Sequence, residues 1–119
     1  MLWLLNEPER LPVTILEELA DSNNIPVFSS LSIWEISIKS AQRKPDFQID
    51  PAQVRLDFTA EGLEELAFNG QHAVAVHSLP AIHKDPFDRA LVAQATVEGI
   101  KLITSDKLLA AYGDIVRLI

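Results

Sequence analysis

Short apolar segments alternate with amphipathic ones along this chain, and this alternation constrains the fold more than any other feature. Three apolar runs have the length and composition of buried strands: residues 25–29, 100–104 and 115–119. The clearest helical stretch, residues 86–98, carries its apolar side chains on one stripe and is followed by Gly99, a residue that often ends helices. Strands joined by helices of this length form parallel βαβ units. The sequence therefore predicts an α/β protein, with a buried parallel sheet covered by helices on both faces.

The remaining elements follow from the same periodicity. Helices are predicted over residues 12–24, 31–39, 51–62, 71–78 and 107–112, and a short strand over residues 63–68. Residues 42–50 are polar and contain Pro45, which predicts a loop. No internal repeat, linker or change of composition divides the chain, so we expect a single domain over residues 1–119.

Composition excludes several classes of protein. The chain has 119 residues, of which 48% are hydrophobic and 23% charged, as in globular domains. It has no cysteine, which fits a reducing compartment and leaves only oxygen and imidazole ligands for a metal. The apolar run of residues 2–5 is far too short to span a membrane, so we expect a cytoplasmic protein. A net charge of −7 argues against broad electrostatic binding of nucleic acid and leaves a local catalytic site open.

Three acidic residues follow predicted strands or begin predicted helices: Glu35, Asp88 and Asp106. The carboxyl ends of parallel strands share one edge of a sheet, so these side chains can meet in one crevice. Carboxylates packed together repel one another, and a hard divalent cation relieves that repulsion. The pattern therefore indicates an Mg²⁺ or Mn²⁺ site, which suits hydrolysis of a phosphodiester.

Each of these acids also has a purely structural interpretation. Ser32 and Glu35 have the spacing of a capping box, and Glu35 can form an i, i+4 ion pair with Lys39. Residues 85–88 provide a helix cap, a proline at the first helical position and an acid in the first turn. Asp106 can offset the dipole of the last helix. Spacing alone does not separate a metal site from three ordinary helix starts.

The other residues able to do chemistry are expected to have structural roles. The histidines match no recognised metal motif in their spacing: His72, His77 and His83. A contact with RNA is the alternative for His83. The aromatic residues on apolar stripes are expected in the core, with base stacking as the alternative: Trp3, Trp34 and Phe87.

Three blocks of sequence resemble the signature blocks of PIN-domain ribonucleases, most closely the toxins of VapBC-type toxin–antitoxin pairs. They are residues 31–39 (LSIWEISIK), 83–95 (HKDPFDRALVAQA) and 98–106 (EGIKLITSD). Residues 2–11, 72–74 and 79–80 fit the same family pattern. The blocks stand in the family's order and at suitable spacing, and the resemblance covers nearly the whole chain.

The resemblance implies a three-layer α/β/α fold with a central parallel sheet and an acidic pocket that binds Mg²⁺ or Mn²⁺. It implies cleavage of RNA, inhibition by a cognate antitoxin and a homodimer. At the matching positions, Glu35, Asp88 and Asp106 become catalytic and metal-ligating residues, and Asp85 becomes an outer ligand or a helix cap. The same resemblance suggests hydroxyls near the site, for which capping of the last helix is the alternative: Thr104 and Ser105.

One departure from the family pattern affects both fold and activity. Members of the family begin with a strand that ends in an aspartate, and that strand lies in the middle of the sheet. Here the family's first helix is expected to start at Leu2, so the strand and its aspartate are expected to be missing and the chain truncated at its N-terminus. We therefore expect a weak or inactive nuclease, with low stability or strand exchange between chains.

Two classes of function follow. The first is a metal-dependent endoribonuclease toxin of PIN type that acts on RNA and is neutralised by an antitoxin. The alternative is a catalytically impaired PIN-like binding module that keeps its dimer or antitoxin-binding surfaces. A different α/β phosphohydrolase is the weaker third option, because the usual Asp-x-Asp after the first strand is absent.

Overall fold

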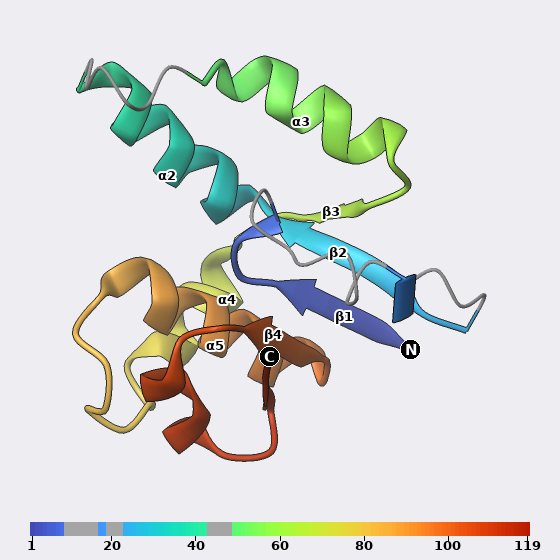
Figure 1. Cartoon of the computed structure of the whole chain (residues 1–119). Coiled ribbons are helices and arrows are strands. Elements are labelled where there is room, and N and C mark those ends of the chain that lie inside the picture. The colour runs from blue at the N-terminus through green and yellow to red at the C-terminus, as the bar shows by residue number, and fades with distance from the viewer. Residues whose placement is uncertain (9–16, 19–22, 43–48) are drawn as a thin grey trace.

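A computed structural model describes residues 1–8, 17–18, 23–42 and 49–119. Its centre is a five-stranded sheet in the order β3-β2-β1-β4-β5 (Figure 1). The strands are β1 (Leu2–Leu5), β2 (Ile25–Ser29), β3 (Glu64–Leu66), β4 (Lys101–Thr104) and β5 (Val116–Leu118). Each neighbouring pair is parallel. The expected central parallel sheet is therefore confirmed.

The helices lie on both faces of this sheet. They are α2 (Ser30–Ala41), α3 (Pro51–Ala60), α4 (Gly70–Val76), α5 (Pro86–Glu98) and the 3-10 helix η2 (Lys107–Tyr112). In Figure 1, α3 lies on one side of the strands and α4 and α5 lie on the other. Among the described residues, no helix has both the length and the apolar composition needed to cross a bilayer.

Alternating side chains of the strands fill two separate cores. Leu4 of β1 belongs to the core beneath α5, whereas its neighbour Leu5 belongs to the core beneath Phe58 of α3. Both leucines are fully buried. The same alternation places Leu102 and Ile103 of β4 in opposite cores. A strand buried on both faces explains the continuous apolar runs, and the three-layer α/β/α architecture is confirmed.

Most predicted elements are present. β2, α5 and η2 have the predicted bounds, residues 25–29, 86–98 and 107–112, and the other predicted elements in the described part of the chain differ by a few residues at their ends. The predicted helix over residues 12–24 lies outside the described residues, except that 17–18 are helical and 23–24 are not. Of the predicted loop over residues 42–50, residues 43–48 lie outside the described part.

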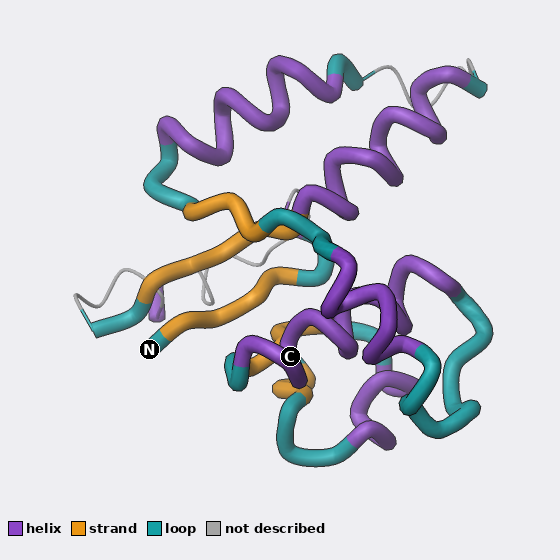
Figure 2. Tube along the Cα trace, turned by 180° about the vertical axis from the view of Figure 1, so that it is seen from behind, coloured by secondary structure: helices purple, strands orange, loops and turns teal. Residues whose placement is uncertain are grey.

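The expectation of a missing first strand is wrong. Leu2–Leu5 is β1, a strand and not the start of a helix, and it pairs with β2 on one side and β4 on the other. Figure 2 shows β1 and β2 side by side from behind. The resemblance placed the family's first helix at Leu2, and four consecutive apolar residues contain no period that separates a strand from a helix and would correct that placement. The expected truncation, low stability and strand exchange rested on that absence and lose their basis.

Trp34 is also placed differently from expectation. The buried face of α2 is formed by Leu31, Ser32 and Ile36, and Trp34 lies off that face with 58% of its surface exposed. Its ring packs edge-on against Phe87, with 5.1 Å between ring centroids. The apolar stripe of α2 is wider than the surface that the sheet and α5 cover, so one large aromatic side chain stays outside the core.

Candidate metal centre

The strand order creates a crevice between the carboxyl ends of β1 and β4. From β1 the chain continues to β2 on one side, whereas β4 lies on the other, so the two strands flank the point where the winding of the sheet reverses. Asn6, directly after β1, ties the two ends together: its backbone N–H donates to the carbonyl of Ile103 at 2.9 Å, and its Nδ2 donates to Thr104 Oγ1 at 2.8 Å. Open α/β sheets bind ligands at such switch points.

Asp106 follows β4 and is held by hydrogen bonds at both carboxylate oxygens. Its backbone N–H donates to Thr104 Oγ1 at 3.0 Å. Its Oδ1 accepts from the backbone N–H of Leu108 at 2.9 Å, so Asp106 is itself the cap of η2. Its Oδ2 lies 2.8 Å from Nε2 of His83. The side chain is thus fixed at the edge of the crevice, and capping does not exclude a second role.

The start of α5 brings in the second carboxylate. Asp85 caps this helix, because its Oδ1 accepts from the backbone N–H groups of Phe87 at 2.8 Å and Asp88 at 3.2 Å. Asp88, in the first turn, lies with Oδ2 3.4 Å from Nε2 of His83. Asp85 was expected to be either an outer ligand or a helix cap, and in the structure it caps α5.

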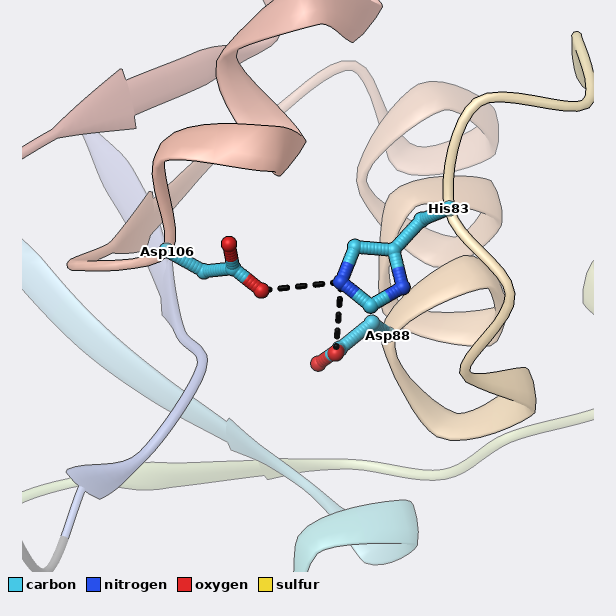
Figure 3. Close-up of side chains that lie close together, drawn as sticks. All are labelled: His83, Asp88 and Asp106. Atoms are coloured by element: carbon cyan, nitrogen blue, oxygen red, sulfur yellow. Dashed lines mark hydrogen bonds and ion pairs between the residues drawn. The ribbon is translucent and has the colours of Figure 1, made fainter.

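His83, Asp88 and Asp106 form a compact cluster (Figure 3). One potential ligand atom from each lies within 4.8 Å of the others, and among the described residues this is the group of acids and histidines close enough to hold a metal ion. The cluster joins the loop before α5, the first turn of α5 and the end of β4. Asp88 and Asp106, expected to meet, are brought together by the fold.

Glu35 reaches the same region from α2. It lines a pocket with Asn6, Leu31, Ser32, Phe87, Asp88 and Leu91. Its carboxylate also lies 3.5 Å from Nζ of Lys39, the expected i, i+4 ion pair. Glu35 is therefore beside Asp88 but outside the tight cluster around His83. Asp88 is therefore shared: it lines the pocket with Glu35 and belongs to the cluster with Asp106.

Ser32 does not cap α2 as expected. The cap is Ser29, whose Oγ accepts from the backbone N–H of Leu31 at 3.0 Å. Ser32 lies inside the helix and its Oγ is buried in the pocket wall, without a hydrogen-bond partner. Buried hydroxyls are normally paired, so this oxygen is an exception among the described residues.

Burial and charged neighbours shift the pKa values of Asp88 and Asp106 in opposite directions. Burial raises the pKa of Asp88 to about 6, and the negative charges of Asp85, Asp106 and Glu35 act in the same direction. A protonated His83 would oppose this shift. In contrast, the hydrogen bond with His83 lowers the pKa of Asp106, aided by the backbone N–H of Leu108. A carboxyl whose pKa is raised beside another that stays ionised is typical of functional sites.

These features fit a hard divalent cation. Carboxylate oxygens are the ligands that Mg²⁺ and Mn²⁺ prefer, and a bound cation would offset both the burial and the acidic neighbours that raise the pKa of Asp88. The donor set contains no thiolate, so it does not favour softer metals.

Sequence reasoning missed three residues of the site: Asn6, Ser32 and His83. Asn6 was overlooked because β1 was not recognised, although an amide directly after a short apolar run is a detectable signal. Ser32 was predicted to cap α2, whereas the cap is Ser29, one turn earlier. His83 contacts Asp106, 23 residues away, through the arrangement of α5 and β4, and no local spacing reveals that contact.

Comparisons with known proteins identify the family and support the fold. The family model of the PIN domain matches residues 1–115, and the chain belongs to the PIN domain family. PIN domains are generally nucleases. The fold is similar to a chain in the crystal structure of VapBC2 from Rickettsia felis bound to a DNA fragment from their promoter. That match has 18% identity and a TM-score of 0.69, and it covers 100% of this chain and 98% of the other. A comparison with curated proteins gave no match.

Proposed function

We propose that this protein is a metal-dependent endoribonuclease of PIN type that acts on RNA as the toxin of a toxin–antitoxin pair in the cytoplasm. The observation that carries the proposal is the meeting of Asp88 and Asp106 at the switch point of the sheet, with Glu35 in the adjoining pocket wall. Two carboxylates that meet in a PIN fold, with a third in the adjoining pocket wall, suit phosphodiester hydrolysis better than simple helix capping, which would not require Asp88 and Asp106 to meet.

The proposed cation ligands are the carboxylates of Glu35, Asp88 and Asp106. Asp85 is a candidate outer ligand in addition to its role as helix cap. A bound Mg²⁺ or Mn²⁺ would activate water and stabilise the leaving oxygen of the phosphodiester. Asn6 would hold the end of β1 against Thr104, so the pocket keeps its shape during the reaction.

The test is cleavage of single-stranded RNA with and without Mn²⁺. The wild-type chain should cleave only with the cation. Asp88→Asn and Asp106→Asn should each lower the cleavage rate by about a hundredfold or more, because each keeps the shape of the side chain and removes a ligand charge. Asp57→Asn, at an exposed position of α3, is the matched control and should keep wild-type activity. Full activity in both site variants would refute the proposal.

A catalytically impaired binding module is the second candidate, and Asn6 favours it. The family pattern has an aspartate after the first strand, whereas here an amide stands after β1 and contributes no charge. Absence of Mn²⁺-dependent cleavage in the wild-type chain, together with its appearance in Asn6→Asp, would support this candidate over the active enzyme.

The proposal includes a homodimer and an antitoxin partner. Large apolar side chains are exposed on neighbouring helices α2 and α3: Trp34, Ile38 and Leu56. Such side chains suit burial against another chain. The VapBC2 neighbour adds support for an antitoxin partner. Light scattering at micromolar concentration should give the mass of a dimer, and co-expression with the product of an adjacent gene should give a stable complex that blocks cleavage. A strict monomer would contradict the dimer.

A further inference from the structure

His83 is held in one position by contacts on both sides of its ring. Nδ1 accepts a hydrogen bond from the backbone N–H of Asp85 at 3.0 Å. Nε2 lies 2.8 Å from Oδ2 of Asp106 and 3.4 Å from Oδ2 of Asp88. The backbone N–H of His83 donates to the Tyr112 hydroxyl at 3.1 Å, and only 12% of the side chain is exposed.

These contacts determine which ring nitrogen carries the proton. A nitrogen that accepts a hydrogen bond from a backbone N–H has its lone pair directed at that group, so Nδ1 carries no hydrogen. In the neutral ring the hydrogen is therefore on Nε2, which donates to Asp106 and faces Asp88 (Figure 3). Coordination of a cation through Nε2 would require removal of this hydrogen and a tautomer that the Asp85 N–H opposes.

We infer that His83 is a positioning residue: it donates its Nε2–H to Asp106, orients that carboxylate for the cation, and is not a ligand itself. The inference rests on the proposed function. The ligand set is then built from oxygens alone, which keeps the preference for Mg²⁺ and Mn²⁺ that a nitrogen ligand would weaken. Groups that hydrogen-bond to metal ligands set their orientation and typically change metal affinity 10–100-fold when removed.

The first experiment tests the tautomer without any metal. Two-dimensional ¹⁵N–¹H correlation of the His83 ring in metal-free protein at pH 8 distinguishes the nitrogen that carries the hydrogen. The expected result is hydrogen on Nε2 and a free lone pair on Nδ1. Hydrogen on Nδ1 would overturn the inference, whatever the protein does with metals.

The second experiment tests positioning in the presence of Mn²⁺. Calorimetric titration should show affinity about tenfold lower in His83→Leu, which loses the donor, and nearly wild-type affinity in His83→Gln, which keeps an N–H donor at similar reach. His77→Leu, at an exposed position after α4, is the matched control and should bind as wild type. Thermal unfolding of each variant verifies that it folds.

Pulsed electron paramagnetic resonance of the wild-type Mn²⁺ complex provides a readout that needs no variant. A positioning role predicts no directly coordinated imidazole nitrogen. A strong ¹⁴N coupling assigned to His83 would overturn the inference while leaving the proposed metal site in place. Equal Mn²⁺ affinity in wild type and His83→Leu would also overturn it. Failure of the wild-type chain to bind Mn²⁺ would instead remove the proposed metal site, and the inference with it.

Discussion

Asp88 links the chemistry of the site to the stability of the chain. Its folded pKa of about 6 lies above the ordinary value of 3.8, chiefly because the carboxylate is buried and then because other acids surround it. Between these two pH values the folded chain still binds a proton that the unfolded chain has lost. The free energy of unfolding contributed by this group therefore falls as pH rises from about 4 to about 6, and stays low above that.

We therefore predict that Asp88→Asn stabilises the metal-free protein at pH 7.5. The gain should be about 1–2 kcal/mol, less than the full pKa shift allows because the carboxylate keeps some contact with water. Urea unfolding in the presence of a chelator at pH 4, 6 and 7.5 measures it. The difference between variant and wild type should be small at pH 4 and largest at pH 7.5, and a difference independent of pH would contradict the assigned origin.

An acid at the position of Asn6 would add one more negative charge to the group of carboxylates. We predict that Asn6→Asp raises the affinity for Mn²⁺ roughly tenfold, because cation affinity rises with the charge of the ligands. Titration calorimetry measures the change. Asn69→Asp, which adds the same charge at the cap of α4, is the control and should leave the affinity unchanged. Unchanged affinity in Asn6→Asp would show that Asn6 does not face the cation.

For single residues, the sequence predicted the acids of the site but not the side chains that surround them. Asp88 and Asp106 are detectable because each stands beside a helix start or a strand end. The contact of Asp106 with His83 depends on how α5 and β4 pack. The Ser32 hydroxyl lacks a hydrogen-bond partner because α2 begins before it, so that it lies inside the helix. Both are consequences of tertiary structure that local spacing does not encode.

At the scale of elements, one buried side-chain pair joins the sheet to α5. Ser29 Oγ, at the end of β2, donates to Gln94 Oε1 at 2.6 Å, and both side chains are fully buried. Gln94 Nε2 also lies 3.5 Å from the carbonyl of Leu66 in β3. The link fixes α5, and with it Asp88, against the carboxyl ends of β2 and β3.

We predict that Gln94→Leu lowers the free energy of unfolding by about 1–3 kcal/mol, because it leaves the Ser29 hydroxyl buried without an acceptor. Gln71→Leu, at an exposed position of α4, is the matched control and should change stability by less than about 0.5 kcal/mol. Urea unfolding of both variants gives the comparison. Equal stabilities would show that the pair contributes nothing beyond packing.

Elements that carry sequence signals at both ends could be predicted from the sequence. α5 begins with Asp85 and Pro86 and ends at Gly99, which adopts φ 67°, a left-handed conformation that glycine tolerates without strain. β2 is delimited by a polar turn and by the cap of α2. β1 has neither signal, since its four apolar residues suit a buried strand and a buried helix equally well.

At the scale of the whole molecule, β1 holds the two cores together. Its neighbours Leu4 and Leu5 belong to opposite cores, and the strand is paired on both edges. We predict that Leu5→Ala lowers the free energy of unfolding by about 2–5 kcal/mol. Leu2→Ala in the same strand, where the side chain is 38% exposed, should cost clearly less. Similar small losses in both variants, measured by urea unfolding, would contradict the central position of β1.

The site exists only in the assembled fold. Its residues come from the ends of β1 and β4, the first turns of α2 and α5, and the loop before α5, and the parallel sheet brings these segments to one edge. We propose that this edge holds a divalent cation between the carboxylates of Asp88 and Asp106.

Anomalous diffraction from crystals of the wild-type protein soaked in Mn²⁺ tests that claim most directly. We expect an anomalous peak within coordination distance of the carboxylates of Asp88 and Asp106, on the side of the pocket lined by Glu35, with the His83 ring outside the coordination sphere. A crystal of Asp88→Asn soaked in the same way is the control and should show a weaker peak or none. Mn²⁺ bound only elsewhere on the wild-type surface, or bound equally in the control, would contradict the account.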